Sequence, residues 1–319
     1  MGEAARYVFR STRDAHRQLT QLFDFIHPTA IAMWNLRWQV RGYMECVERP
    51  SHQDIEARFA RGSKISAGSI KKSTVDTTWE AQLQQFASII LINTIAIFED
   101  FTANMAALIY TDRTRRRRMA DAMQFPASQA NKDRPDPLRL VGQQLSPFSG
   151  AVTWDKAVLR RLDLNAQHDL LLCYRLFKEI KNAIAHNGGR ANNSTKEAYE
   201  RFSAVIVNGK VGATNAPDHT SINSVGDEVK ITYRGIVGFS EIVFAILTNY
   251  DVVFSEYEIA EKELPYHVLP DLRAWPTSQA SVNRRIEKMF TSNDFPSIKV
   301  TDNLKAYLIR MGYIPNYVK

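Results

Sequence analysis

The sequence predicts a mainly α-helical protein with a small antiparallel β insertion and a short helical appendage towards its C-terminal end. Three observations support this fold class. A segment free of proline and glycine extends from Trp79 to Asp112. Apolar residues recur at helical spacing from Leu172 to Asn187. Two turn sequences typical of β-hairpins follow, Asn208-Gly209 and Gly226-Asp227.

The first region, residues 1–79, is expected to be helical. Apolar positions predict a helix over residues 1–49, and Pro28 predicts a break within it, because proline lacks the backbone N–H that a helix interior needs. Residues 50–78 are polar and contain glycines, so a loop is expected in their second half. The N-terminal residues form no apolar stretch, and no signal peptide is expected.

The second region, residues 80–264, is expected to form the core domain around the long helix that begins at Trp79. A membrane span is the alternative for this helix. Its uncharged part, Gln82 to Phe98, is shorter than the ~20 residues that a span requires, and Glu99-Asp100 follow it. We therefore expect a buried core helix and no membrane. Since a buried carboxylate needs a partner, Glu99 or Asp100 should face a cation or a polar cleft.

Further elements follow along the chain. Four prolines within residues 124–153 predict a long loop, and helix is expected to resume near Trp154 and again over Gln167–His186. A capping box formed by Ser194 and Glu197 predicts the start of the next helix. After the two hairpin signals, a long helix is expected from Gly235, and residues 265–319 are expected to form a linker and a small helical tail.

Cysteine usage and charge limit the classes of function. The two cysteines, Cys46 and Cys173, are far apart and lack metal-ligand spacing, so we expect neither a disulfide framework nor a zinc site. The chain contains no phosphate-binding loop and no nucleophile motif, and we expect no cofactor and no metal. The net charge of +7 is compatible with a nucleic-acid partner, and the low cysteine content with a cytoplasmic location.

A run of arginines has two interpretations. Its members are Arg113, Arg115, Arg116, Arg117 and Arg118. They can bind phosphates, and in particular RNA. They can equally form a solvated helix end in which the cations lie near the negative pole of the helix dipole.

His186 also has two interpretations. Helical geometry places it off the apolar stripe, with Asn182 one turn before it and Arg175 three turns before it on nearly the same face. A histidine in the last turn can stabilise the end of the helix, while Gly188 or Gly189 takes the left-handed capping position. Alternatively, His186 takes part in chemistry.

The segment "KNAIAHNGG" resembles the signature of the HEPN superfamily (higher eukaryotes and prokaryotes nucleotide-binding). That signature is an arginine, commonly followed by asparagine, and then a histidine near the end of a long helix. Asn182 and His186 match it, whereas Lys181 stands where arginine is expected. "INTIAIFEDF" is similar to the family's acidic helix, with Glu99 as the match. The resemblance covers about residues 80–262 and implies a HEPN-like helical bundle, frequently a homodimer.

The resemblance also implies an activity. Many HEPN proteins are metal-independent ribonucleases of toxin and phage-defence (abortive infection) systems, in which the ribose 2′-OH attacks the adjacent phosphate and leaves a 2′,3′-cyclic phosphate. By this resemblance His186 is the acid and base, Lys181 supplies the cation, Asn182 gives a hydrogen bond, and Glu99 orients the cations. Arg175 can replace Lys181 as the cation because it shares the face of His186. The charge of the arginine run is expected to guide RNA. A partner protein from the same locus is also implied.

Two further functions stay open from the sequence. Lysine keeps the positive charge of the motif arginine but lacks its planar fork, so the chain can instead be a non-catalytic HEPN module that binds RNA, a nucleotide or a protein. It can also be a helical scaffold in which His186 only caps a helix.

Overall fold

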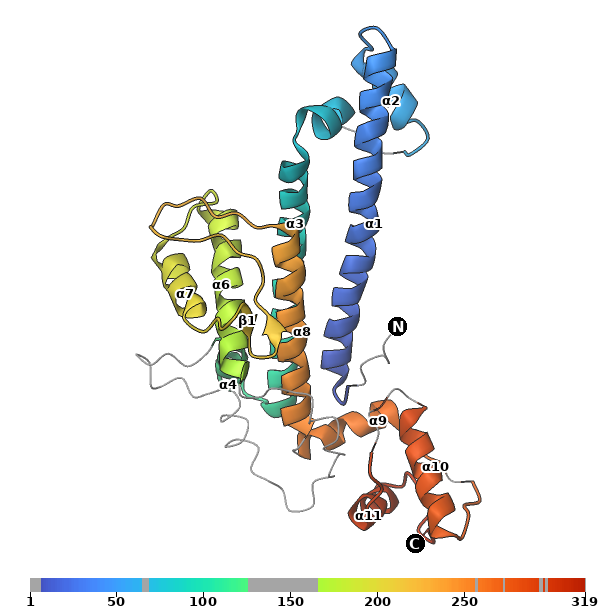
Figure 1. Ribbon diagram of the computed structural model, residues 1–319. Helices are drawn as coiled ribbons and strands as arrows, with labels where there is room; N and C mark the ends of the chain where they lie inside the picture. Colours follow the sequence, from blue (N-terminus) through green and yellow to red (C-terminus); the bar gives the residue numbers. More distant parts are fainter. Residues whose placement is uncertain are drawn as a thin grey trace.

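The computed structural model describes residues 7–64, 69–125, 166–255, 258–271, 273–292, 295 and 298–318. It is mainly helical and contains a small two-stranded sheet, as the sequence predicts (Figure 1). The expected loop over residues 124–153 and the expected helix near Trp154 lie, from residue 126 on, outside the described residues.

Helix α1 (Arg10–Cys46) is continuous, so the predicted break at Pro28 is wrong. Ile26 and Ala30 flank the proline and are both buried. Packing of the helix on both sides of Pro28 therefore outweighs the one backbone hydrogen bond that the proline removes. The upper part of α1 rises beyond the other long helices (Figure 1).

The upper part of α1 carries two short elements, α2 (His52–Phe59) and a π-helical turn, η1 (Lys72–Asp76). A separate small core of Val40, Ile55 and Ile70 joins them. The buried Arg37 side chain donates a hydrogen bond of 2.5 Å to the carbonyl oxygen of Thr77, just before the next helix. This bond fastens α1 to the start of α3.

Helix α3 (Trp79–Ile109) lies at the centre of the bundle, and α4 (Arg113–Gln124) folds back along it. Helices α3 and α8 (Tyr233–Ser255) are each long and apolar enough to cross a membrane. Both bury much of their surface in the bundle, as core helices of soluble proteins do. The length and apolar composition of these two helices are weak evidence for a membrane and are compatible with a soluble protein.

Helix α6 (Gln167–His186) packs on α8 and α7 (Asn193–Ser203). Its aromatic residues form much of the core: Phe177 stacks on Phe239 with ring centroids 4.4 Å apart, and Tyr174 lies against Phe98 at 4.6 Å. The start of α7 differs from the prediction. Its N-cap is Asn192, whose side chain accepts from the Thr195 backbone N–H at 2.9 Å, so the predicted Ser194–Glu197 capping box is wrong.

The β insertion confirms one hairpin and corrects the other. Asn208 and Gly209 both adopt positive φ angles (51° and 72°), the geometry of a two-residue hairpin turn, and Val207 pairs with Lys210 across this turn. Strands β1 (Lys210–Val211) and β2 (Thr214–Asn215) then pair antiparallel around residues 212–213. The Gly226-Asp227 turn forms no hairpin of its own. The backbone of this segment pairs instead with residues 189–191, which follow α6. This pairing satisfies backbone groups of Gly189 and Ala191 that lie beyond the helix.

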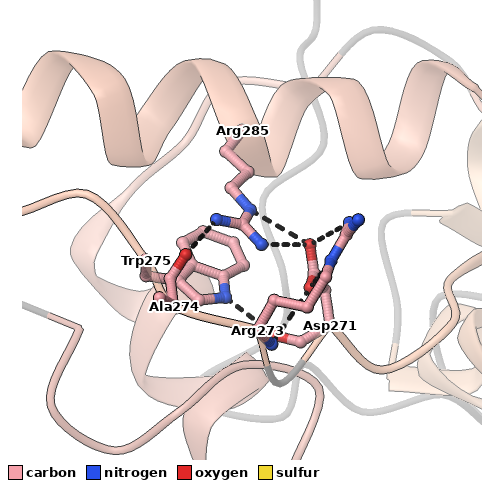
Figure 2. Close-up of polar contacts among 5 residues, drawn as sticks. All are labelled: Asp271, Arg273, Ala274, Trp275 and Arg285. Atoms are coloured by element: carbon pink, nitrogen blue, oxygen red, sulfur yellow. Dashed lines mark hydrogen bonds and ion pairs between the residues drawn. The ribbon is translucent and has the colours of Figure 1, made fainter.

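The C-terminal region contains η4 (Glu258–Glu263), α9 (Leu264–His267), α10 (Gln279–Thr291) and α11 (Asp302–Arg310). Helices α10 and α11 lie in the region that was expected to form a small helical tail. Figure 2 shows how the segment before α10 is fixed: Asp271 accepts hydrogen bonds from Arg273 (2.9 Å) and Arg285 (2.7 Å). These bonds hold the pKa of Asp271 well below its usual value. Trp275 donates to the Asp271 backbone and lies under the Arg285 guanidinium.

A buried polar network joins the lower end of the bundle to the start of α1. The Asp251 carboxylate of α8 accepts from the backbone N–H groups of Val8 (2.9 Å) and Phe9 (3.0 Å). Glu263 accepts from the Arg10 N–H, and His267 Nε2 donates to the Val8 carbonyl oxygen at 2.8 Å. Burial raises the pKa of Asp251 to about 6, against the lowering effect of its hydrogen bonds.

Candidate functional site

His186 is the last residue of α6, and its side chain is exposed. No hydrogen bond or ion pair of its ring occurs in the part of the chain that the structure describes. The helix is ended by the two glycines instead. Gly188 and Gly189 have φ angles of +58° and +73°, and the Gly189 N–H donates to the Ala183 carbonyl oxygen at 3.0 Å. His186 is thus placed at the surface with an exposed side chain.

The chain that follows His186 is held by a second segment. The Ala191 N–H donates to Asp227 O (2.9 Å), the Gly226 N–H to Ala191 O (2.8 Å), and the Val229 N–H to Gly189 O (2.8 Å). These three bonds connect residues far apart in the sequence. They fix the end of α6, and with it the backbone of His186, more firmly than an isolated helix end would be.

Two of the three Lys and Arg side chains on α6 are neutralised. Arg175 forms an ion pair of 2.7 Å with Glu179 and lies over the Phe125 ring at 4.6 Å. Lys178 forms an ion pair of 2.6 Å with Glu99 of α3 and donates to Gln124 Oε1 at 2.8 Å. The expectation that Glu99 faces a cation is confirmed, and the cation is Lys178.

Lys181 is the third cation on α6, and it is half-buried. Its Nζ lies 3.4 Å from Asn182 Oδ1, a long contact, and it has no carboxylate partner among the described residues. Lys181 is therefore the one cation of α6 whose charge stays available to a ligand in the described part of the chain.

The spacing along α6 separates the predicted site residues into two groups. At 1.5 Å of rise per residue, Lys181 lies about 8 Å from His186 along the helix axis, whereas Arg175 lies about 16 Å from it. Lys181, Asn182 and His186 therefore occupy the upper end of the helix. Arg175 and Glu99 lie lower, and a single chain does not bring Arg175 to the same phosphate as His186.

Sequence reasoning missed Lys178 and its partners. Lys178, Asn182 and His186 are spaced four residues apart and form one row along α6. This spacing indicates that the cation of Lys178 lies on the same row of α6 as Asn182 and His186. Gln124, whose side chain bridges Lys178 and Thr102, gave no such signal because its position depends on how α4 folds back along α3.

The arginine run forms the first turns of α4, and all five side chains are exposed. Asp112 caps this helix by accepting from the Arg115 N–H at 2.8 Å. The arginines thus lie at the positive pole of α4 and directly follow the negative pole of α3, whose C-cap is Tyr110. Arg116 donates to the Tyr110 carbonyl oxygen at 2.5 Å, and the described residues give the run no ion pair. Helix α4 lies near the lower end of α6, away from His186 (Figure 1).

No protein-family model, curated protein or solved structure matches this chain. The candidate site therefore rests on its own geometry. Among the described residues, no group of three or more His, Cys, Asp or Glu side chains is arranged to hold a metal ion. The upper end of α6 offers an accessible imidazole and an unpaired ammonium group, a pair that can transfer a proton and hold an anion.

Proposed function

We propose that this protein is a metal-independent endoribonuclease of a toxin or phage-defence (abortive infection) system, acting in the cytoplasm. The observation that carries the proposal is the charge pattern of α6. Arg175 and Lys178 are neutralised by Glu179 and Glu99, whereas Lys181, the α6 cation nearest to His186 along the helix, has no ion-pair partner in the described structure. A helix that only packs has no need of an unpaired, half-buried lysine beside an exposed histidine.

The proposed reaction uses the two groups as follows. His186 removes the proton of a ribose 2′-OH, and the 2′-oxygen forms a bond to the adjacent phosphorus. The bond from phosphorus to the 5′-oxygen breaks, that oxygen takes a proton from protonated His186, and a 2′,3′-cyclic phosphate remains. Lys181 stabilises the charge that develops on the phosphate oxygens, and Asn182 donates a hydrogen bond nearby. Glu99 acts from a distance, by fixing Lys178 and the packing of α6 on α3.

The proposal includes a homodimer in which two α6 ends share one cleft. On an ideal helix Lys181 and His186 point about 140° apart, so one chain aims them differently and a second chain can complete the set. The outward face of α3 supports this arrangement because it exposes apolar residues, Ile89 and Ile92, at 46% and 45%. Since α3 and α6 run in opposite directions through the Glu99–Lys178 pair, Ile92 and His186 lie at similar heights.

The homodimer is tested by the mass of the protein in solution. Light scattering at micromolar concentration should give twice the chain mass, and Ile92→Glu should give one chain mass with loss of activity. Phe25→Glu changes an apolar residue of α1 that is exposed at 67%, and it serves as the matched control that should stay dimeric. A monomeric wild-type protein that cleaves RNA would remove the shared cleft from the proposal.

The activity is tested by toxicity on expression. The wild-type chain should arrest the growth of the expressing cells, and His186→Ala should relieve the arrest. Arg175→Ala is the matched control, since it removes a cation that is already paired on the same helix. Equal toxicity of all three proteins, at equal soluble amounts, would contradict the proposal.

A non-catalytic RNA-binding module is the second candidate, and the arginine run favours it. Five exposed arginines without ion pairs among the described residues bind phosphates whether or not α6 is active. This function is the better one if RNA binds at the run but neither the wild-type protein nor Lys181→Arg cleaves it.

A further inference from the structure

One stripe of α1 is covered by α8 in its lower part only. His16, His27, Trp34 and Trp38 are separated by 11, 7 and 4 residues, which places them on the same side of the helix. Phe244 of α8 packs against His16 at 4.7 Å, and Tyr233, the first residue of α8, lies 5.8 Å from His27. Above Tyr233 no part of α8 remains to cover the stripe.

The uncovered part of the stripe is aromatic. Trp34 is 37% exposed and Trp38 is 53% exposed. The two rings meet edge to face at 5.6 Å, and Trp79, at the start of α3, lies 4.9 Å from Trp34. The Arg37–Thr77 hydrogen bond fixes the position of Trp79 relative to α1. Three tryptophans are thus held in place at the surface, although nothing in the described bundle packs over two of them.

The charge around these rings is positive on α1. The guanidinium of Arg41 lies 5.6 Å from the Trp38 ring centroid. From Phe25 to Met44 the helix contains no aspartate or glutamate, and Arg41 is the cation on this face because Arg37 is buried. In the neighbouring segment, Lys71 and Lys72 are balanced by Asp76 and Glu80. Exposed tryptophan rings beside one cation therefore suit a partner with planar rings and negative charge better than an acidic protein or a purely apolar partner.

We propose that Trp34, Trp38, Trp79 and Arg41 form a platform on which bases of single-stranded nucleic acid stack. Aromatic rings beside cations bind such strands with little sequence preference, because every base has a π face and every nucleotide a phosphate. The platform lies on the upper part of α1, towards the end of the molecule where α6 ends at His186 (Figure 1). The inference rests on the proposed ribonuclease function for the identity of the natural strand as RNA.

The test uses a 15-nucleotide oligodeoxythymidylate, which has no 2′-OH and cannot be cut by the proposed reaction. Three of the five tryptophans lie at the platform, so bound bases should quench the intrinsic fluorescence. Anisotropy of the labelled oligonucleotide gives the affinity. Trp34→Leu and Trp38→Leu should each weaken binding on the order of tenfold. Arg41→Gln should weaken it less and reduce the dependence of the affinity on salt.

Two controls separate this inference from the proposed function. Phe25→Leu alters an exposed apolar residue of the same helix outside the stripe and should bind like the wild type. His186→Ala should also bind like the wild type, so loss of cleavage leaves the platform untouched. Unchanged affinity of both tryptophan variants would overturn the inference.

Two other outcomes would also overturn it. The first is tryptophan-dependent binding to vesicles of 30% phosphatidylserine in phosphatidylcholine without binding of the oligonucleotide, which would assign the face to a membrane. The second is a loss of dimer mass in the tryptophan variants with unchanged oligonucleotide affinity, which would assign it to a second copy of the chain.

Discussion

Two histidines at opposite ends of the bundle differ in every property that decides their use. His267 is buried (1% exposed), its Nε2 donates to the Val8 carbonyl oxygen, and its ring packs against Phe295 at 4.8 Å. His186 is exposed at the end of α6, and its ring makes no hydrogen bond within the described residues. His267 therefore holds two chain segments together, whereas His186 is available to a ligand.

The polar groups near His267 are hydrogen-bonded within the fold, whereas a cation near His186 has no ion-pair partner in the part of the chain that the structure describes. Near His267, Asp251 and Glu263 bind the backbone N–H groups at the start of α1. Near His186, Lys181 has no carboxylate partner in the described structure, although Arg175 and Lys178 of the same helix do. Hydrogen bonds of these polar groups thus hold the start of α1 at the lower end. The unpaired charge at the upper end is the feature that calls for a functional explanation.

The largest expected effect concerns the unpaired lysine. Lys181→Ala should lower RNA cleavage by about 10²- to 10³-fold, because the interaction strengthens as charge develops on the phosphate. Lys181→Arg should retain or raise the activity, since the guanidinium fork suits phosphate. Arg175→Ala, which removes a paired cation, should have little effect. Cleavage of labelled RNA on gels measures the activity of all three variants. If Lys181→Ala cleaves like the wild type and Arg175→Ala loses activity, the phosphate-stabilising cation is Arg175 and not Lys181.

A second effect concerns pH and the lower end. The folded-state pKa of Asp251 is about 6, above its ordinary value of 3.8, so folding favours the protonated form. Its contribution to stability is fully present below about pH 4 and is lost as pH rises through 6. Relative to Asp251→Asn, the wild-type free energy of unfolding in urea should fall by roughly 2 kcal/mol between pH 4 and 7. A difference that is constant with pH would show that Asp251 is not buried as described.

A third effect compares the histidines by the same substitution. His267→Phe keeps an aromatic ring but leaves the buried Val8 carbonyl without its donor, so the free energy of unfolding should fall by about 1–2 kcal/mol. His186→Phe should change it by less than about 0.5 kcal/mol, as is usual for exposed positions. Equal losses of stability in chemical denaturation would remove the distinction between the two residues.

The smallest expected effect concerns the arginine run at the start of α4. Replacing Arg115–Arg118 with glutamine should weaken RNA binding several-fold at moderate salt. It should also flatten the plot of log affinity against log salt concentration, because fewer counterions are released. An unchanged slope would assign the run to a solvated helix terminus.

The helices of the bundle could be predicted from local patterns, since apolar residues at helical spacing mark α3, α6 and α8 wherever packing follows the pattern. The continuity of α1 through Pro28 could not, because the packing of Ile26 and Ala30 decides it. The predicted hairpin at Gly226-Asp227 is wrong for a similar reason. The backbone groups that pair with this turn follow α6, some 35 residues earlier in the chain.

For the candidate site, the sequence places Lys181, Asn182 and His186 near one another, because they share a helix end. It does not reveal that Arg175 is paired with Glu179, or that Lys178 reaches Glu99 from another helix. Pairing between elements depends on the tertiary structure. The sequence alone therefore does not show which of Arg175 and Lys181 is available to a ligand. The ion pairs of the folded structure give that information.

The central claim is that the free histidine performs metal-independent cleavage, and the most direct measurement is RNA cleavage in EDTA by wild-type protein and His186→Ala. The wild-type protein should cut labelled RNA and leave a 2′,3′-cyclic phosphate, and the variant should lose at least about 10²-fold of the rate while remaining folded. Cleavage that requires a divalent metal, or an equal rate in His186→Ala, would contradict the account.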